Sequence, residues 1–596
     1  RLLLRGLHYR LLFAAAIVAL VSVSAGIMVV LLDPKFHDAG AAIWWSFLRL
    51  SDPGYLGDDE GAVSVTISTV VTILGYVLFL GLLVAILTQW MNTLIERVES
   101  GTTRIRFKNH VLILGWNHRT PSIVLELLET RGRALRFLAE SGASRLRIVI
   151  LAECVDAHMR EQLRSSLGSR WDDRRVVLRS GSPLELEGLE RVALRDAAAV
   201  ILPGADFSTA EPGVADSEII KTLASISLVG RQEGHSRVAV AAIHNANRSE
   251  VARRAYGGDL EVIATDRLVS RLMAQSILQP GLWTVYWELL NLFEENAVFV
   301  RKVGEEHPDS IGQARAACAD AVVIGIIPSD SRVPILNPPG DRSIRSDDSL
   351  VFIARHFADC DVSSAVARSA QVAAQTGNWS PVVSDINSVL ILGWSRMVPK
   401  LLEDLFRYKP HSLKVDVVGT TPVEERELST DSLLSASESG AVRQIECDFL
   451  DPDAAAGIGV DGYDAVLMLA RERMETEAVA DAATISAYLT IEPSLECVQT
   501  PHVVVELQED ENQSLFAGKG VDAIVSPMIV SYILSQVALE PELGLILQEL
   551  TRSRGTKILF RTFSPENSQG DCSFGELAEQ AALRDETALG VVTNTA

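Results

Sequence analysis

The sequence has little cysteine, and none of it lies in a disulfide or metal-binding pattern. The six cysteines among 596 residues are scattered, and no two have the CxxC spacing of a zinc ribbon or a redox motif. This argues against a disulfide scaffold and favours reduced, cytosolic thiols. HExxH, GxSxG and Walker A motifs are absent as well, and no metal ligand set is readable. We therefore expect no enzyme activity.

Positive charge is also scarce. The chain carries 54 Lys and Arg against 77 Asp and Glu, a formal net charge of −23. A nucleic-acid-binding protein needs a basic surface, so we expect no nucleic-acid partner. What is abundant is apolar sequence: 48% of the residues are hydrophobic and the mean hydropathy is +0.20. Such values suggest membrane segments, and the length predicts roughly three to four domains.

Two uncharged runs near the N-terminus predict membrane helices. Residues 11–32 are long enough to cross a bilayer, whereas the apolar core of a signal peptide, the alternative, is shorter. Residues 63–91 predict a second, tilted or overlong span. Arg and Lys precede the first run and follow the second, whereas the charges of the loop between the runs are mainly acidic. The positive-inside rule therefore places both termini in the cytoplasm. We expect a multi-pass protein of the plasma or inner cell membrane.

The loop between the spans has the layout of a pore loop. Residues 39–50 are apolar and aromatic, too few to span but suited to a re-entrant helix. Residues 51–57 follow as a candidate filter, with Pro53 and Gly54 ending the helix. The alternatives are an extracellular loop with an interfacial tryptophan pair and, for the acidic residues, a solvated turn. The candidate pore residues are Ser51, Asp52, Pro53, Gly54, Tyr55, Asp58 and Asp59. In an oligomer, the carboxylates of the three aspartates would favour cations.

One pore loop does not enclose a pore, so a closed ring is required, and a homotetramer is the expected assembly. The potassium filter sequence TVGYG is absent, which leaves both monovalent and divalent cations open as the permeant ion. Gly75 and Gly81 in the second span are candidate hinges of a gate. Close packing of helices at small residues is the alternative explanation for both glycines.

The rest of the chain contains an internal repeat. HVLILGWN at 110–117 returns as SVLILGWS at 388–395, and matching strand and helix patterns follow over roughly 200 residues in each copy. Alternating strands and helices predict a parallel, doubly wound, Rossmann-like sheet in each copy. The second copy is the shorter, so its last lobe is shortened or incomplete. The predicted domains are a pore domain at 1–100, a linker at 101–109, a first α/β domain at 110–365, a linker at 366–387 and a second α/β domain at 388–596.

The turn after the first strand is where such sheets hold dinucleotides. Here each copy keeps only the first glycine of GxGxxG, which hinders close approach to a pyrophosphate. In the first copy, Gly115, Asn117 and Glu153, which follows the second strand, are the candidate cofactor-binding residues. The alternative is a Rossmann sheet that serves as a scaffold.

The order of these parts resembles ion channels with RCK (regulator of potassium conductance) domains, and most closely the CASTOR/POLLUX family and its bacterial relatives. The resemblance is carried by the twin VLILGW strands at 111–116 and 389–394 and by WWSFLRLSDPG at 44–54. The family filter reads like ADSGNHA. Its acidic residue and glycine match Asp52 and Gly54, whereas its Asn and His have no match, so the ion preference does not carry over.

The resemblance implies a tetramer whose tandem RCK domains form a cytosolic gating ring. A ligand that binds one ring conformation more tightly shifts the pore equilibrium by that difference in affinity. We therefore expect a cation channel in membrane lipid, gated by a ligand or ion, with Ca²⁺ or a nucleotide as candidate regulators and no cofactor assigned. The alternative from another class is a membrane-anchored nucleotide-binding regulatory protein without a pore.

Overall fold

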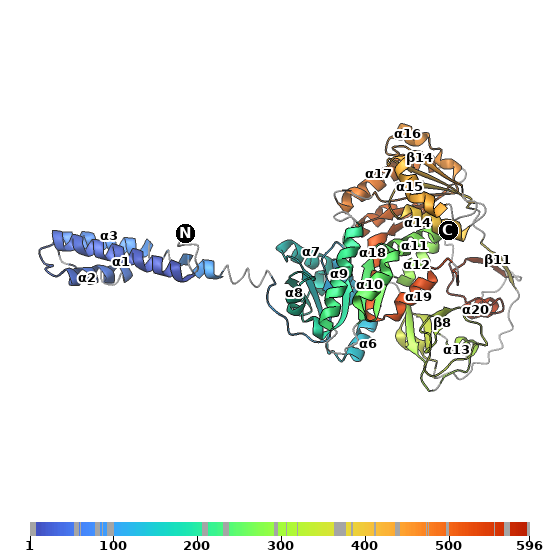
Figure 1. Cartoon of the computed structure of the whole chain (residues 1–596), viewed down its shortest axis with the longest axis horizontal. Coiled ribbons are helices and arrows are strands. Elements are labelled where there is room, and N and C mark those ends of the chain that lie inside the picture. The colour runs from blue at the N-terminus through green and yellow to red at the C-terminus, as the bar shows by residue number, and fades with distance from the viewer. Residues whose placement is uncertain are drawn as a thin grey trace. The chain divides into compact units, whose positions relative to one another are not determined.

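The chain divides into two compact units, Arg1–Thr103 and Arg104–Ala596 (Figure 1), and each is described by itself. The computed structural model describes residues 7–592 except 53–58, 60, 78–80, 82–83, 86, 92–100, 205–211, 231–237, 291–295, 306, 319, 363–376, 383–385, 410–412, 435–440, 472–473, 475, 496–499, 554 and 566–572.

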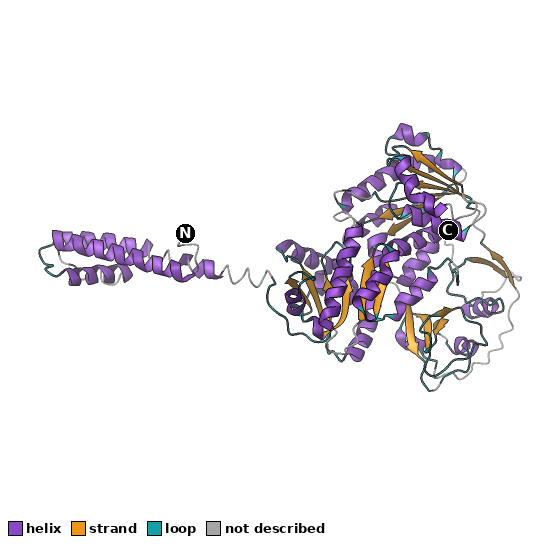
Figure 2. Cartoon of the chain, in the orientation of Figure 1, coloured by secondary structure: helices purple, strands orange, loops and turns teal. Residues whose placement is uncertain are grey.

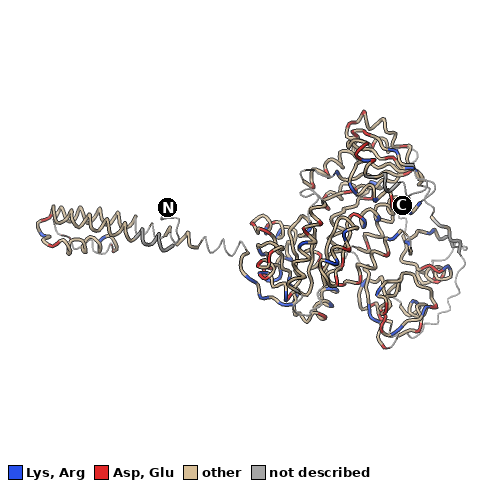
Figure 3. The backbone as a smooth tube through the Cα atoms, viewed as in Figure 1, with Lys and Arg blue, Asp and Glu red and all other residues tan. Residues whose placement is uncertain are grey.

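The first unit contains the helices α1 (Leu7–Leu32), α2 (Ala39–Ser51) and α3 (Ala62–Gly75). Among the described residues, one helix is long and apolar enough to cross a membrane, Ala15–Leu32 within α1. The predicted second span, 63–91, lies partly outside the described residues. Beyond α3, the chain makes a π-helical turn at 76–77 and has helical backbone at 81, 84–85 and 87–91. Charged residues gather near one end of this unit, and the described parts of the helices are otherwise mostly uncharged (Figure 3).

Helix α2 lies where the sequence predicts a re-entrant helix. Asp38 caps its N-terminus by accepting a hydrogen bond from the backbone N of Gly40 at 2.9 Å, a usual role of Asp before a helix. α2 packs against both α1 and α3. A Cβ atom on Gly26 of α1 would lie 2.7 Å from Ile43, so the small residue lets the two helices approach closely. Buried apolar residues of α1, α2 and α3 form a cluster of Ala25, Val29, Leu50, Ile67 and Val71.

The second unit contains two six-stranded parallel sheets with the same strand order, and helices cover both faces of each sheet (Figure 2). The doubly wound, Rossmann-like sheets predicted from the repeat are thereby confirmed. In spatial order, copy one has β3 (Val176–Ser180), β2 (Ile148–Ala152), β1 (His110–Leu114), β4 (Ala197–Leu202), β5 (Val238–Ile243) and β6 (Leu260–Ala264). In the same order, copy two has β14 (Ala441–Glu446), β13 (Lys414–Gly419), β12 (Ser388–Leu392), β15 (Ala465–Met468), β16 (His502–Leu507) and β17 (Val521–Val525).

Helices connect and cover these strands. In copy one they are α5 (Thr120–Glu129), α6 (Arg131–Ser141), α7 (Ala157–Leu167), α8 (Leu186–Arg191), α9 (Pro212–Gly230), α10 (Ser249–Tyr256), α11 (Thr265–Leu278) and α12 (Leu282–Leu290). In copy two they are α14 (Val398–Tyr408), α15 (Val423–Leu434), α16 (Pro452–Ala456), α17 (Glu477–Leu495), α18 (Ser526–Leu539) and α19 (Glu542–Leu550).

The two copies exchange the helix that follows their sixth strand. α11 of copy one packs on α14, β15 and β16 of copy two, and α18 of copy two packs on α5, β4 and β5 of copy one. Figure 1 shows α11, α12 and α18 in the middle of this unit. α18 is as apolar as a short membrane helix, but every residue described in it except Met528 is buried in this shared core. The exchange makes one continuous apolar core out of two sheets.

A smaller lobe completes copy one. It is an antiparallel sheet in the order β7-β10-β8-β9 with one helix, and it comprises β7 (Ala297–Lys302), α13 (Ile311–Ala317), β8 (Ala321–Ile327), β9 (Ile335–Leu336) and β10 (Ser349–Ala354). The segment predicted as a linker contains β11 (Gly377–Pro381), which pairs with β18 (Arg561–Pro565). α20 (Phe574–Ala582) follows, and the stretch after it returns to the small lobe, where Asn337 donates to the carbonyl oxygen of Asp585 at 2.7 Å.

Candidate functional site

In the first unit, a buried ion pair ties the end of the candidate filter to helix α2. The Arg49 guanidinium binds the Asp59 carboxylate through two nitrogens, at 3.0 and 2.5 Å. Trp45 Nε1 donates to the same carboxylate at 3.2 Å, and the Arg49 guanidinium stacks 4.1 Å from the Trp45 ring. Both charged side chains are about 95% buried, so this bidentate pair holds Asp59 against α2.

Of the other candidate pore residues, two lie at the end of α2 and four lie outside the described residues. Ser51 ends α2 and its hydroxyl donates to the Phe47 carbonyl oxygen at 2.9 Å, while the Asp52 backbone N donates to the Leu48 carbonyl oxygen at 2.7 Å. Both residues are exposed. Pro53, Gly54, Tyr55 and Asp58 lie outside the described residues.

The two candidate hinge glycines have different surroundings. A Cβ on Gly75 would lie 2.2 Å from the Leu50 carbonyl oxygen, whereas a Cβ on Gly81 would meet no described atom within 4 Å. Close approach between α2 and α3 therefore explains the glycine at position 75. Gly75 thus fits the alternative explanation, close packing of helices at small residues, whereas Gly81 does not.

In copy one, the switch point between β1 and β4 is bridged by Asn117. Its Nδ2 donates to the carbonyl oxygens of Pro203 and Gly204 at 3.4 and 3.0 Å. Its Oδ1 accepts from the Arg119 backbone N and from the Thr120 hydroxyl, each at 3.1 Å. The side chain is 2% exposed. Asn117 thus serves to hold two loops together at the place where a dinucleotide would approach.

The other two cofactor candidates of copy one lie on either side of this bridge. Gly115 has φ +112°, a left-handed backbone angle that favours glycine. Glu153 is exposed beyond the end of β2. In copy one, the side-chain amide of Asn117 makes its hydrogen bonds within the protein. This arrangement fits a Rossmann sheet that serves as a scaffold better than one that binds a dinucleotide.

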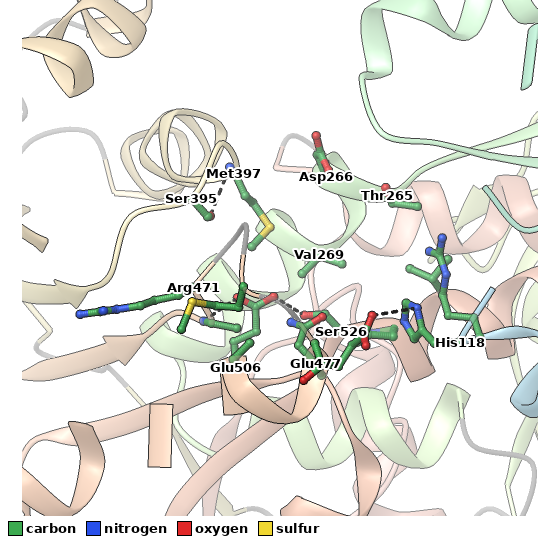
Figure 4. A pocket seen from close by; sticks show the side chains of 18 residues that line it. His118, Thr265, Asp266, Val269, Ser395, Met397, Arg471, Glu477, Glu506 and Ser526 are labelled. Carbon is green, nitrogen blue, oxygen red and sulfur yellow. Dashed lines mark hydrogen bonds and ion pairs between the residues drawn. The ribbon is translucent and has the colours of Figure 1, made fainter. Parts of the chain in front are cut away.

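In copy two, the corresponding switch point, between β12 and β15, opens into a pocket (Figure 4). The repeat places Ser395 where copy one has Asn117, and the shorter side chain accepts from the Met397 backbone N at 3.3 Å. Copy one closes the pocket from the opposite side with His118, Arg119 and the start of α11. Further lining residues from copy two are Ala470, Arg471, Met474, Thr476, Glu477, Ala480, Glu506, Gln508, Ser526, Pro527 and Val530.

The inner wall of this interdomain pocket carries a buried carboxylate. Glu506, near the end of β16, is 6% exposed. Its Oε1 accepts from the Ser526 hydroxyl at 2.7 Å and its Oε2 from the Ala470 backbone N at 3.2 Å. Copy one has Ala242 at the equivalent strand position, so the acid is specific to the copy that has the pocket. Because a buried charge needs partners, these two donors hold it in place.

Charged contacts cross the pocket between the two copies. His118 Nδ1 of copy one lies 3.5 Å from Glu477 Oε1 of copy two, and Figure 4 shows this pair at one side of the pocket. Arg396 Nε of copy two lies 3.9 Å from Asp266 Oδ2 of copy one. A ligand in this pocket would contact both copies and would respond to their relative position.

Five helices, α5, α11, α14, α17 and α18, begin at or next to lining residues. Helix N-termini carry partial positive charge, and three carboxylates, Asp266, Glu477 and Glu506, are among the lining residues. The lining also includes apolar Val269, Met397 and Val530. The pocket thus suits a ligand with an apolar body and polar groups that match both donors and acceptors.

Sequence reasoning centred on copy one and missed this pocket. The available signals were the acid within VVVEL at 503–507, where copy one reads VAVAAI at 238–243, and the Ser395 that replaces Asn117. Asp481 of α17 holds the loop after β16, which includes the lining residue Gln508, because it accepts hydrogen bonds from the backbone N atoms of Gln508 and Glu509 at 2.8 and 3.0 Å. Burial raises the pKa of this carboxyl.

Comparison with a solved structure first identifies a shared fold for the second unit. Its fold matches the structure titled "Structure of the human SLO3 gating ring" with a TM-score of 0.51 at 16% identity, covering 74% of this chain and 84% of that chain. The second unit, with its tandem Rossmann-like sheets, therefore shares its fold with that gating ring.

The sequence comparisons then indicate the family. The model of the family described as "Castor and Pollux, part of voltage-gated ion channel" matches residues 266–369. "Probable ion channel POLLUX" of Arabidopsis thaliana is 20% identical over 92% of this chain and 68% of the relative. "Ion channel CASTOR" of Lotus japonicus is 23% identical over 93% and 67%. These matches confirm that the chain resembles the CASTOR/POLLUX ion channels over most of its length.

A prokaryotic channel also matches part of the chain. "Calcium-gated potassium channel TvoK" of Thermoplasma volcanium is 27% identical over 53% of this chain and 82% of that protein. The named relatives are ion channels rather than enzymes. The chain spans 58% to 68% of the length of the matching channels of Arabidopsis thaliana, Oryza sativa and Medicago truncatula.

Proposed function

We propose that this chain is the subunit of a homotetrameric cation channel of the cell membrane, gated by ligand binding to a cytosolic ring of RCK-type domains. The observation that carries the proposal is the union in one chain of two features. One is the short helix α2, which a buried ion pair ties to Asp59 at the position where the sequence predicts a re-entrant helix, and the other is the pair of tandem Rossmann-like sheets whose fold matches a gating ring. The resemblance to the CASTOR/POLLUX channels supports the same function. In this topology both termini are cytoplasmic.

The ion path is proposed to run along residues 51–59. Ser51 and Asp52 begin this segment at the exposed end of α2, and the Arg49–Asp59 pair holds its other end. Because Asp59 is buried against Arg49, it positions the filter, and Asp52 is the better candidate for an acidic ring. Pro53, Gly54, Tyr55 and Asp58 complete the proposed path. Gly81 is the better of the two candidate hinges, since Gly75 is explained by packing.

The regulatory ligand is proposed to bind in the interdomain pocket at the switch point of copy two. Its walls come from both copies, so a ligand that fits one arrangement better stabilises that arrangement of the ring. Ca²⁺ and a nucleotide are both candidates. The name of the calcium-gated relative supports Ca²⁺, and the position at a topological switch point supports a nucleotide. In copy one, the proposal for Gly115, Asn117 and Glu153 is weakened by the Asn117 bridge.

The proposal is tested by single-channel recording of the purified full chain in planar bilayers, with K⁺, Na⁺ and Ca²⁺ compared in the presence and absence of nucleotides. Asp52→Asn is expected to reduce conductance or alter selectivity. Asp38→Asn is the matched control, because it removes one carboxylate from the same loop and Asn is an equally good helix cap. Discrete currents changed by the first substitution alone would support the pore.

Other outcomes separate the parts of the proposal. Currents that both variants change equally would point to a general effect of loop charge and would move the filter away from Asp52. Silence in all ions, with Ca²⁺ and with nucleotides, from a protein that is monomeric or dimeric in detergent, would instead favour the membrane-anchored regulatory protein.

A further inference from the structure

A second cavity in the same unit is lined almost entirely by arginine. Its lining residues are Arg271 of α11, Arg407 of α14, and Arg552 and Ser553, which follow α19. One guanidinium therefore comes from copy one and two from copy two. Like charges around one space repel each other, so a cavity of this composition calls for an explanation.

Arg271 is the most buried of the three. Its side chain is 14% exposed, and its Nε makes no hydrogen bond among the described residues. The nearest acid atom, Asp404 Oδ1, is 4.0 Å away, while Asp404 Oδ2 accepts from the Ser270 hydroxyl at 2.9 Å. Burial lowers the pKa of the Arg271 guanidinium, and neighbouring Arg267 and Arg407 lower it further against the opposing effect of Asp404.

Each arginine of the cavity has one acidic neighbour, and these acids use only part of its hydrogen-bonding capacity. Glu403 is shared between Lys400 and Arg407. Glu549 pairs with Arg552 at 3.0 Å, an exposed i,i+3 pair of the kind that contributes little. Each of these pairs engages only part of a guanidinium, which has five N–H donors, so donors remain for a ligand in the cavity.

The internal repeat provides a natural comparison for this cavity. The repeat aligns Arg271 of α11 with Tyr532 of α18, and Arg407 of α14 with Glu129 of α5. The exchanged helix therefore packs on the other copy at the equivalent place without arginine at either position. Helix C-termini favour cations, which explains Arg407 and Arg552 in part, but Arg271 lies in the middle of α11.

We propose that this tri-arginine cavity binds the phosphate group of a small anionic regulator. Guanidinium groups bind phosphate oxygens in pairs and keep their charge when buried, and the buried Ser553 hydroxyl adds a further donor. The bound phosphate would join α11 of copy one to α14 and the end of α19 of copy two. The inference does not depend on a pore, because it concerns the second unit alone.

The test is equilibrium binding of inorganic pyrophosphate to the full chain in detergent micelles, measured by titration calorimetry. One site per chain is expected, and Arg271→Gln and Arg552→Gln should each weaken it at least about tenfold. Arg253→Gln is the matched control, since Arg253 and Glu250 form the same exposed i,i+3 pair on α10, and it should leave binding unchanged. Arg552 is largely exposed, so its loss should not disturb folding even if loss of Arg271 does.

Two further arms identify where the phosphate comes from. Binding of a soluble nucleoside triphosphate with the same dependence on Arg552 would support a free phosphate ligand. Binding only to vesicles that contain a phosphoinositide, and not to phosphatidylcholine vesicles, would support the same phosphate chemistry on a lipid headgroup. The absence of binding in every arm, or equal affinity for the Arg552→Gln and Arg253→Gln variants, would overturn the proposal.

Discussion

Copy one and copy two of the α/β domain fold alike but treat the switch point of the sheet differently. In copy one, Asn117 links the loop after β1 to the loop after β4 through two hydrogen bonds. In copy two, Ser395 makes a shorter contact within its own turn, and a pocket remains. A duplicated domain can thus separate two roles. In copy one, hydrogen bonds join the two loops at the switch point, and in copy two the switch point lines a pocket.

The difference extends along the first helix of each copy. Glu126 of α5 and Asp404 of α14 are equivalent buried carboxylates, and each faces the helix contributed by the other copy. Asp404 accepts from Ser270 at 2.9 Å. Glu126 receives a long contact from Gln536 Nε2 at 3.4 Å, and burial raises its pKa to about 7. The symmetric fold therefore has an asymmetric charge pattern at its centre.

The largest expected effect concerns a feature that the two copies share. Asp216 accepts from the backbone N atoms of His244 and Asn245 at 2.9 and 3.0 Å, and Asp481 does the same for Gln508 and Glu509. Substitution of either aspartate by alanine leaves two such donors without their acceptor, and in copy two it also removes the hydrogen bond that Asn512 Nδ2 donates to Asp481 at 2.8 Å. Each change should cost about 4 kcal/mol of local stability, seen as faster amide hydrogen exchange in the loop after β5 or β16.

Equal losses for Asp216→Ala and Asp481→Ala would show that the two copies are equally well supported at this point. A loss in one copy that is smaller by more than about 2 kcal/mol would break the comparison, because it would mean that only one loop depends on its aspartate.

The second effect measures the difference between the copies. Asn117→Ala removes four hydrogen bonds in a buried loop and should cost about 3 kcal/mol, whereas Ser395→Ala removes one and should cost about 1 kcal/mol or less. Hydrogen exchange in the turns after β1 and β12 reports each loss. Similar costs at the two positions would contradict the bridging role of Asn117.

The third effect is a dependence on pH. The pKa of Glu126 is raised in the folded state, so the folded chain holds this proton more tightly and stability falls as the pH rises from about 4.5 to about 7. Glu126→Gln removes this titration and should stabilise the protein by about 2 to 3 kcal/mol at pH 8, but by little at pH 5. Thermal unfolding of the full chain at the two pH values measures the gain.

Asp404→Asn serves as the matched variant for this third effect. Burial also raises the pKa of Asp404, but Ser270 and Arg271 oppose that rise, so its gain at pH 8 should be smaller. A gain for Glu126→Gln that is the same at pH 5 and pH 8 would mean that the carboxyl does not titrate in this range.

The sequence was sufficient to predict the two sheets, because VLILGW recurs with the same helix and strand patterns after it. It could not predict the exchange of α11 and α18, since an apolar helix pattern shows that a face is buried but not which sheet buries it. Pairing of β11 with β18 was hidden for the same reason, as it joins residues far apart in the chain. Asn117 in a glycine turn looks the same in sequence whether it binds a ligand or two carbonyl groups of its own protein.

Of these substitutions, Ser395→Asn should change stability least and the interdomain pocket most. Ser395→Asn gives copy two the bridging side chain of copy one, with the carbonyl groups that follow β15 as its expected acceptors. Stability should change by less than about 1 kcal/mol, because hydrogen bonds gained offset the apolar contacts disturbed. The response of the proposed channel to an activating ligand should weaken at least about tenfold, as measured by ligand titration in bilayer recordings.

Ser395→Ala is the control for this last change, since it keeps the pocket open and should leave the ligand response within about threefold of the original. A response that Ser395→Asn leaves unchanged would remove the interdomain pocket from the gating proposal without touching the pore, because Ser395 belongs to the second unit. If both variants lost the response, the turn after β12 itself would be the sensitive element, and the open and closed switch points of the two copies would not explain where the ligand binds.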